Sequence, residues 1–340
     1  MVNCEVFVLL VGFVLCSSIA SSEPRNAIVT LVTGYHSGYA YGAVALGESL
    51  KVVGSKLKRV VMVTPEVDTD ERSLLSLHWD IVEVDPIPCV HRSALQPGIP
   101  DINQYPEGLQ QDMKRWGNTC TKFSAWKLVE YDRIIFMDSD TIVLEPIDDV
   151  LYLYSNASLA ASPECFPPDT FNSGFMVLTP SIDTFEYIVD RGIRMGSAEG
   201  GDQGILNNYY CPEWFTANSD NEKCGRLPWM YNVEAQYYLM YKNYRALYGM
   251  DKIKVIHFIN DGKPWKTLFY DLNYDSMTMT SMIKSLSEDL YVAAHLYWRY
   301  CFLRATGMRP PSKSIYYSQW SDVTNRRGIY SAIDEKLFDS

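Results

Sequence analysis

The sequence predicts an α/β fold with a mostly parallel central sheet that is covered by helices on both faces. Short apolar runs rich in Val and Ile alternate along the chain with segments whose apolar residues recur at helical spacing. Apolar strands that alternate with helices are typical of a parallel sheet with both faces covered. The chain is also long enough for a large core, because 47% of its 340 residues are hydrophobic.

The expected elements follow one another along the chain. We expect strands over Asn26–Thr33, Arg59–Thr64, Ile81–Val84 and Arg133–Leu144, another from Gly174, and a last one over Lys252–Phe258. We expect helices over Tyr39–Val53, Asp70–His78, Lys122–Tyr131 and Ser181–Met195. Between Pro86 and Asn118 the chain is rich in Pro, Gly, Asn and Gln, which predicts a long functional loop.

Two acidic residues stand in the middle of an apolar run, RIIFMDSDTIVL. Asp138 and Asp140 lie where that strand should end, and in parallel sheets ligands bind at the carboxyl ends of the strands. Paired carboxylates suit a divalent cation with oxygen ligands, and His257 follows another strand. The alternative is that one aspartate caps a turn and the other is solvated. A cation would also let a chain of net charge -11 bind phosphates, whereas nucleic acid would be repelled.

The first twenty residues predict a signal peptide for the secretory pathway. Val6 to Cys16 is apolar apart from Gly12, and small residues follow at a suitable cleavage position. We therefore expect the protein in the ER or Golgi lumen, or secreted, with an uncleaved membrane anchor as the alternative. The sequon at Asn156 agrees with this route. Six cysteines remain after cleavage and can pair in an oxidising lumen, Cys211 and Cys224 being nearest in sequence.

Seven motifs occur in the order, and near the spacings, of one known family. They are YAYGAVALGESL, CTKFSAWKL, IIFMDSDTIVLEPIDDV, FNSGFMVLTPS, GGDQGILN, LPWMYN and KVIHF followed by GKPW. Over roughly residues 26–266 the sequence resembles the glycogenin-like glycosyltransferases of family 8. The resemblance implies a GT-A-type nucleotide-sugar fold, a catalytic domain over residues 26–275, and a UDP-sugar donor whose sugar is transferred with retention. Residues 276–340 would form a helical C-terminal extension.

The resemblance also implies roles for individual residues. Asp138, Asp140 and His257 match the metal ligands of the family, with Mn²⁺ as the expected ion and Mg²⁺ as the alternative. Asp202, Gln203 and Lys122 match the catalytic positions. The donor-binding positions are matched by Leu31, Thr33, Tyr39, Arg115, Lys122, Ser139, Asn172, Ser173, Glu199, Asp202, Gln203 and Lys263.

The sequence departs from the family pattern at the donor site. Arg115 and Lys122 are two residues closer together than in the family, and TGYHSGY carries two extra residues. Glu199 replaces an aspartate that touches the donor sugar, and Asn260 replaces a glycine. The extra methylene of Glu199 leaves the identity of the sugar open.

The leading interpretation is a Mn²⁺-dependent retaining hexosyltransferase that acts on a glycan, glycoprotein or glycolipid. The donor would be UDP-glucose or a related UDP-hexose, and a homodimer is left open. One alternative is a self-glucosylating primer protein, although a signal peptide would separate it from cytosolic glycogen. Another is a protein that binds sugar nucleotides or glycans without turnover. A dehydrogenase is disfavoured because no GxGxxG follows the first strand. Candidate acceptor tyrosines are Tyr231, Tyr237, Tyr238, Tyr241, Tyr244 and Tyr248.

Overall fold

The computed structural model describes residues 24–35, 37–91, 116–165, 169–197, 199–214, 223–235, 253–259, 262–265 and 290–307. The predicted signal peptide, Arg115, Asn260 and the tyrosines between 237 and 248 lie outside these residues. The proposed domain boundary at residue 275 also lies outside them, so it stays a prediction. Among the helices that are described, none combines the length and the apolar character needed to cross a membrane.

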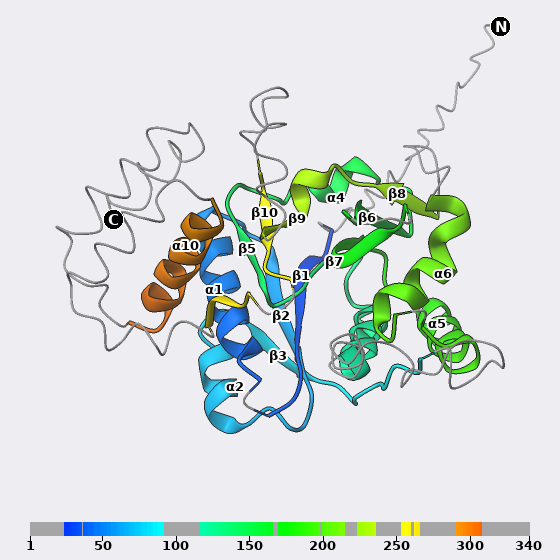
Figure 1. Ribbon diagram of the computed structural model, residues 1–340, viewed down its shortest axis with the longest axis horizontal. Helices are drawn as coiled ribbons and strands as arrows, with labels where there is room; N and C mark the ends of the chain where they lie inside the picture. The colour runs from blue at the N-terminus through cyan, green and yellow to red at the C-terminus, as the bar shows by residue number, and fades with distance from the viewer. Residues whose placement is uncertain are drawn as a thin grey trace, which may run out of the picture.

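The centre of the molecule is a seven-stranded sheet in the order β3-β2-β1-β4-β7-β6-β8 (Figure 1). Four strand pairs are parallel, and the two pairs made by β7 are antiparallel. The predicted class, an α/β fold with a mostly parallel sheet, is therefore confirmed. The strands are β1 (Asn26–Val32), β2 (Lys58–Val63), β3 (Asp80–Glu83), β4 (Arg133–Met137), β6 (Leu159–Pro163), β7 (Phe171–Leu178) and β8 (Cys224–Arg226).

Helices cover both faces of this sheet. Alternate residues of β1 face opposite layers: Ile28 belongs to the core cluster that contains Leu46, whereas Val29 belongs to the cluster that contains Trp126. The helices of the first side are α1 (Tyr39–Val52), α2 (Thr69–Leu75) and α10 (Leu290–Ala305). Those of the second side are η3 (Trp116–Lys127), α5 (Ile182–Met195) and α6 (Asp202–Trp214), and two short turns are α4 (Val150–Leu153) and η4 (Trp229–Tyr231).

The C-terminal helix α10 lies along α1 (Figure 1). Arg304 places its Nε 2.8 Å from the carboxylate of Glu48, whose side chain is only 1% exposed. The indole of Trp298 lies 6.1 Å from that of Trp265, and both belong to the core between the two helices. Helix α10 is thus an integral part of this side of the core.

A second, three-stranded sheet carries the remainder of the acidic motif. It consists of β5 (Thr141–Val143), β10 (Val255–His257) and β9 (Val233–Glu234), with β5 antiparallel to β10. The single strand expected over Arg133–Leu144 is therefore wrong. The chain leaves the main sheet at Met137, turns, and enters the small sheet at Thr141, which donates from its amide and its hydroxyl to the carbonyl of Asp138.

Other element boundaries differ from the sequence prediction. The segment expected as a helix over Lys122–Tyr131 is a 3₁₀ helix that begins six residues earlier, inside the expected loop, and ends at Lys127. Strand β7 begins at Phe171, three residues before Gly174. Strands β6, β8 and β9 were not predicted, because runs as short as CGR and VE show no periodicity.

A glycine lets α1 approach the acidic turn. A Cβ atom on Gly42 would lie 2.2 Å from the carbonyl oxygen of Ser139 and 2.8 Å from Cζ3 of Trp265. Such distances are impossible for real side chains, so the turn between the two aspartates keeps its place only because residue 42 has no side chain.

We expect Gly42→Ala to lower the free energy of unfolding by about 1–3 kcal/mol, because the new methyl group overpacks the turn. Alanine by itself would favour the helix, so a loss cannot come from helix propensity. The measurement is urea denaturation, with Gly117→Ala as the control because a Cβ there meets nothing within 4 Å. A Gly42→Ala protein as stable as the parent would show that the close approach is not real.

Candidate active site

A pocket of about 360 Å³ opens at the carboxyl ends of β1 and β4. This is where ligands bind in sheets of this kind, and its size is in the range of small-molecule sites. Every site residue predicted from the sequence lines the pocket except Arg115, which lies outside the described residues. They are Leu31, Thr33, Tyr39, Lys122, Asp138, Ser139, Asp140, Asn172, Ser173, Glu199, Asp202, Gln203, His257 and Lys263.

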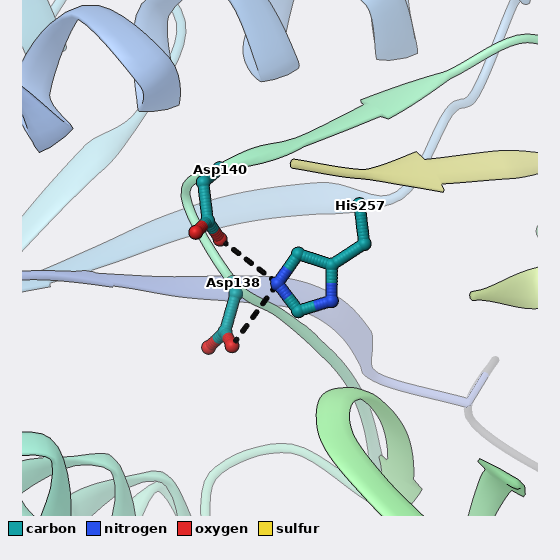
Figure 2. Close-up of side chains that lie close together, drawn as sticks. All are labelled: Asp138, Asp140 and His257. Atoms are coloured by element: carbon teal, nitrogen blue, oxygen red, sulfur yellow. Dashed lines mark ion pairs between the residues drawn. The ribbon is translucent and has the colours of Figure 1, made fainter. Parts of the chain in front are cut away.

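The two aspartates of the turn and His257 converge on one point (Figure 2). Nε2 of the imidazole lies 3.1 Å from Oδ1 of Asp140 and 3.8 Å from Oδ2 of Asp138. Neighbouring ligands on a small octahedral cation, each about 2.1 Å from the metal, would be about 3 Å apart. Two carboxylates and an imidazole at this spacing therefore fit Mn²⁺ or Mg²⁺, and these three residues would hold the ion.

The imidazole reaches this point because Gly174 leaves room for it. A Cβ atom on that glycine would lie 2.3 Å from Cε1 of His257. The same glycine accepts the backbone amide of Asp138 through its carbonyl, at 2.9 Å. Strand β7 thus positions both the histidine ring and the first aspartate.

Each aspartate gives its other oxygen to a buried lysine. Lys122 Nζ lies 3.0 Å from Oδ1 of Asp138. Lys263 Nζ donates to Oδ2 of Asp140 and to the carbonyl of Phe258. Both lysine residues are less than a tenth exposed. The oxygens that remain, one on each aspartate, are those that face the histidine.

These contacts shift the pKa of the groups in opposite directions. Burial would lower the pKa of Lys122, but the charges of Asp138 and Asp202 outweigh it and raise this pKa above its ordinary value. Burial would raise the pKa of Asp140, but Lys263 and the imidazole hold it far below its usual range. For His257 the charge of Asp140 outweighs burial and raises the pKa. The pKa of Asp138 is raised by burial and by Asp140, against the effect of Lys122.

Lys122 also connects the acidic turn to α6. Its Nζ lies 2.9 Å from Oδ2 of Asp202, and it donates to the hydroxyl of Ser173 at 3.1 Å. Asp202 is the first residue of α6, and its amide donates to Oγ1 of Thr119 at 3.0 Å. It therefore combines a favourable position at a helix N-terminus with a place in the pocket.

The two amide side chains of the pocket are held by a glutamate that the sequence analysis did not single out. Glu164 Oε2 accepts from Asn172 at 2.9 Å and from Gln203 at 3.0 Å. Burial and the adjacent Glu164 raise the pKa of Glu234 to about 8, so at neutral pH Glu234 carries a proton that it can donate to Glu164. The side-chain oxygen Oε1 of Gln203 accepts the backbone amide of Ser173 at 3.0 Å.

The outcome for the other predicted residues is mixed. Glu199 is buried, which raises its pKa to about 7, and its carboxylate accepts the amide of Gly204. The ring of Tyr39 lines the pocket and also packs against Trp265, with the ring centroids 5.1 Å apart. Tyr231 is 3% exposed and packs against Phe175 in the core.

Further lining residues were not predicted. Trp116 and Asn118 fell inside the expected loop, where no periodicity marked them. Glu164 had one available signal, an acidic residue three positions after the short apolar run Leu159–Ala161. The residues missed are Trp116, Asn118, Thr119, Glu164, Gly201 and Ile259.

Comparison with known proteins agrees with the sequence resemblance. The model of the family Glycosyl transferase family 8 matches residues 30–268. Human glycogenin-1 is 34% identical over 265 residues, which are 78% of this chain and 67% of that protein. Human glycogenin-2 is 32% identical over 279 residues, 80% of this chain and 50% of that protein.

Among solved structures, the galactosyltransferase LgtC in complex with donor and acceptor sugar analogs has 13% identity and a TM-score of 0.48. The match covers 86% of this chain and 99% of that one. The family match and the glycogenin relatives lead to one conclusion. The chain belongs to glycosyl transferase family 8 and is a UDP-sugar glycosyltransferase.

Proposed function

We propose that this enzyme is a retaining hexosyltransferase that depends on a divalent cation, Mn²⁺ in the first place. Its donor would be UDP-glucose or a related UDP-hexose, and its acceptor a glycan, glycoprotein or glycolipid in the secretory pathway. The observation that carries the proposal is the convergence of Asp138, Asp140 and His257 beside two buried lysines in one pocket. Similarity to the glycogenins supports the choice of a glucose-type donor.

The charges of the pocket support a cation. Asp138, Asp140 and Asp202 are held by two ammonium groups, those of Lys122 and Lys263. One negative charge therefore stays uncompensated when the His257 imidazole is neutral, which is the form that binds a metal. An anionic donor would be repelled by this site unless a further positive charge entered with it. When bound, the cation would supply Lewis-acid stabilisation of the departing diphosphate.

Residues of the chain itself would bind a donor phosphate, stabilise the anomeric carbon and orient the sugar. Lys263 lies beside the metal site, where its ammonium group can also meet a phosphate of the donor. Asp202 pairs with Lys122 at 2.9 Å, and its carboxylate would stabilise positive charge at the anomeric carbon, as carboxylates do in glycosidases. The amide of Gln203, fixed by Glu164, would orient the sugar.

A second candidate is self-glucosylation, which the similarity to glycogenin-1 favours. Of the candidate acceptor tyrosines, the described residue Tyr231 is buried in the core and is unsuited to accept a sugar. The mass of the intact protein after incubation with UDP-glucose separates the two candidates, because only a primer protein gains hexose units.

We also propose that the chain enters the secretory pathway. The apolar run near its N-terminus supports this, and so does the sequon, whose Asn156 is exposed in the turn before β6. A disulfide joins Cys89 to Cys120, and disulfides persist mainly in oxidising compartments.

Asp140→Asn is expected to lower Mn²⁺-dependent hydrolysis of the preferred UDP-sugar by on the order of 100-fold or more, because a neutral amide is a poor ligand and no longer balances Lys263. The measurement is a panel of UDP-sugars with and without Mn²⁺. Asp190→Asn, which removes an exposed carboxylate from the Arg194 pair on α5, is the matched control and should keep full turnover. Normal turnover by Asp140→Asn would refute the metal assignment.

Asp202→Asn is expected to reduce kcat by on the order of 100-fold while donor affinity changes by less than about threefold, because the amide keeps the shape but loses the charge. Steady-state kinetics and donor titration give the two quantities. The control is Asp183→Asn, an exposed acid in the first turn of α5, which tests the helix dipole alone. An equal loss of affinity and kcat would reduce Asp202 to a positioning role.

The full chain expressed in eukaryotic cells is expected to carry one N-linked glycan at Asn156. Treatment with an endoglycosidase should reduce its mass, and Asn156→Gln should abolish this reduction. Asn103→Gln, at an asparagine outside any sequon, serves as the control. An unmodified protein that stays in the cytosol would rule out the secretory route.

A further inference from the structure

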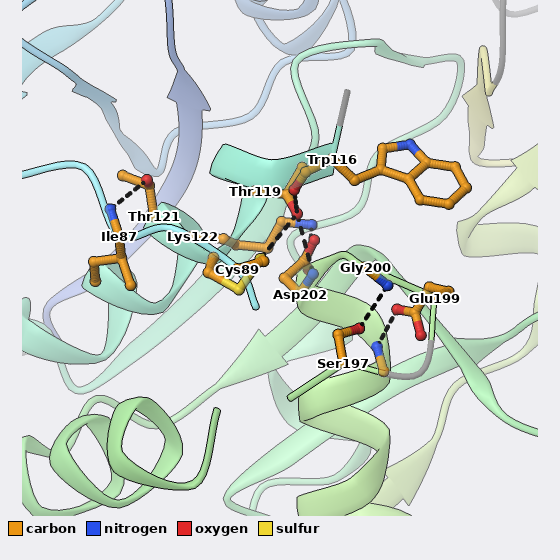
Figure 3. Close-up of a disulfide and its surroundings, with 12 residues drawn as sticks. Ile87, Cys89, Trp116, Thr119, Thr121, Lys122, Ser197, Glu199, Gly200 and Asp202 are labelled. Carbon is orange, nitrogen blue, oxygen red and sulfur yellow. Dashed lines mark hydrogen bonds and ion pairs between the residues drawn. A yellow bond between two sulfur atoms is a disulfide. The ribbon is translucent and has the colours of Figure 1, made fainter. Parts of the chain in front are cut away.

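We infer that the Cys89–Cys120 disulfide positions Lys122 and Asp202 for the reaction, and that its reduction by a dithiol slows transfer. The inference rests on the proposed roles of these two residues. Cys120 lies two residues before Lys122 in η3, and Cys89 lies in residues 85–91, which we call the strap (Figure 3). The strap follows β3, the edge strand of the main sheet.

The strap binds η3 next to the disulfide. The amide of Ile87 donates to Oγ1 of Thr121 at 2.9 Å, and that of Cys89 donates to the carbonyl of Gly117 at 2.7 Å. With the disulfide, whose Cα atoms are 5.3 Å apart, these contacts all fall on the five residues before Lys122. The strap therefore fixes the turn of η3 that precedes Lys122.

The strap also holds the segment before Asp202. The amide of Ser197 donates to the carbonyl of Val90 at 2.7 Å, and His91 forms a β-bridge with the same serine. The hydroxyl of Ser197 accepts the amide of Gly200 at 3.1 Å, two residues before α6 begins. The strap therefore supports the backbone that carries Lys122 and the backbone that carries Asp202.

Thr119 joins the two supports beside the disulfide. Its Oγ1 lies 3.6 Å from Sγ of Cys89, donates to the carbonyl of Trp116 at 2.8 Å, and accepts the amide of Asp202 at 3.0 Å. Movement of Cys120 would therefore move the adjacent threonine, and with it the group that fixes the backbone of Asp202.

The disulfide is needed because the backbone hydrogen bonds of η3 alone stabilise it weakly. It is a 3₁₀ helix of twelve residues, and 3₁₀ runs longer than three or four residues are uncommon because their hydrogen bonds are poorly aligned. The ion pairs of Lys122 hold its ammonium group, but they do not fix the backbone that carries it. The disulfide to the strap supplies the restraint on the backbone that η3 lacks.

The chemistry of release is thiol–disulfide exchange. A thiolate of the dithiol attacks Sγ of Cys89, which is half-buried, while Cys120 is 1% exposed. The Cys89–Cys120 bond breaks and a mixed disulfide forms, with Cys120 leaving as the thiolate. The second thiol of the reagent then displaces Cys89, so two electrons and two protons pass to the protein and the reagent becomes a disulfide.

The test compares the oxidised protein, the same protein reduced with dithiothreitol, and the variant Cys89→Ser/Cys120→Ser. We expect reduction to lower kcat about tenfold and to change KM for the UDP-sugar less than about threefold, because Lys122 and Asp202 shift while Asp140, His257 and Lys263, which other elements carry, stay in place. Oxidised dithiothreitol should restore the parent, and the double variant should be slow and insensitive to both reagents. Thr119→Val, which keeps the disulfide, should also lower kcat.

Hydrogen exchange provides a readout that does not depend on turnover. Exchange of the Asp202 amide and of the amides of residues 117–122 should become about tenfold faster after reduction, while the amides of β1 stay protected. Unchanged exchange, or an unchanged kcat, in the fully reduced protein would overturn the inference. Absence of UDP-sugar turnover in the oxidised parent would instead refute the proposed function, and the exchange result would still decide the role of the disulfide.

Discussion

Lys122 and Lys263 each bind one aspartate of the turn between β4 and β5, and the other oxygen of each aspartate faces His257. Without these two ammonium groups, a pair of ionised carboxylates could not be kept together in a largely buried pocket, because each would lose hydration and repel the other. The lysines neutralise enough charge for the pair to persist, yet they leave the oxygens toward the histidine available. The two carboxylates can therefore stay buried without a metal, and the oxygens that face His257 can still bind a divalent cation.

The fold serves this arrangement through a change of sheet. Strand β4 ends at Met137 and β5 begins at Thr141 in the second sheet, so the aspartates lie in a turn rather than within a strand. In a regular strand, residues 138 and 140 would both point to one side, with their Cα atoms held about 7 Å apart by the strand repeat. Gly42 lets helix α1 approach this turn closely, and Gly174 does the same for the imidazole of His257. Lys122 and Asp202 come from η3 and α6 on the other side of the sheet, and the strap binds the segments that carry both.

The sequence was sufficient for the fold class, and its motifs located a pocket lined by every predicted residue that is described. Apolar strands leave a strong periodic signal, and motifs in fixed order identify a family even when each is weak. The break of Arg133–Leu144 was missed, because its apolar residues look alike in one strand or two. Glu164 was missed because its importance lies in contacts with Asn172 and Gln203, which are distant in sequence. Pairing of Cys89 with Cys120 could not be read either, since it depends on where the strap runs after β3.

Helix α10 lies beyond the residues that the family model matches, which end at 268. Yet Arg304 compensates the buried Glu48, and Trp298 covers Trp265, whose neighbour Lys263 holds the acidic turn. A recombinant fragment trimmed to the shared family region would therefore leave the buried Glu48 with His78 and Lys51 but without its arginine partner, and would uncover an indole next to the donor pocket. The smallest autonomous unit suitable for expression extends at least to the end of this helix.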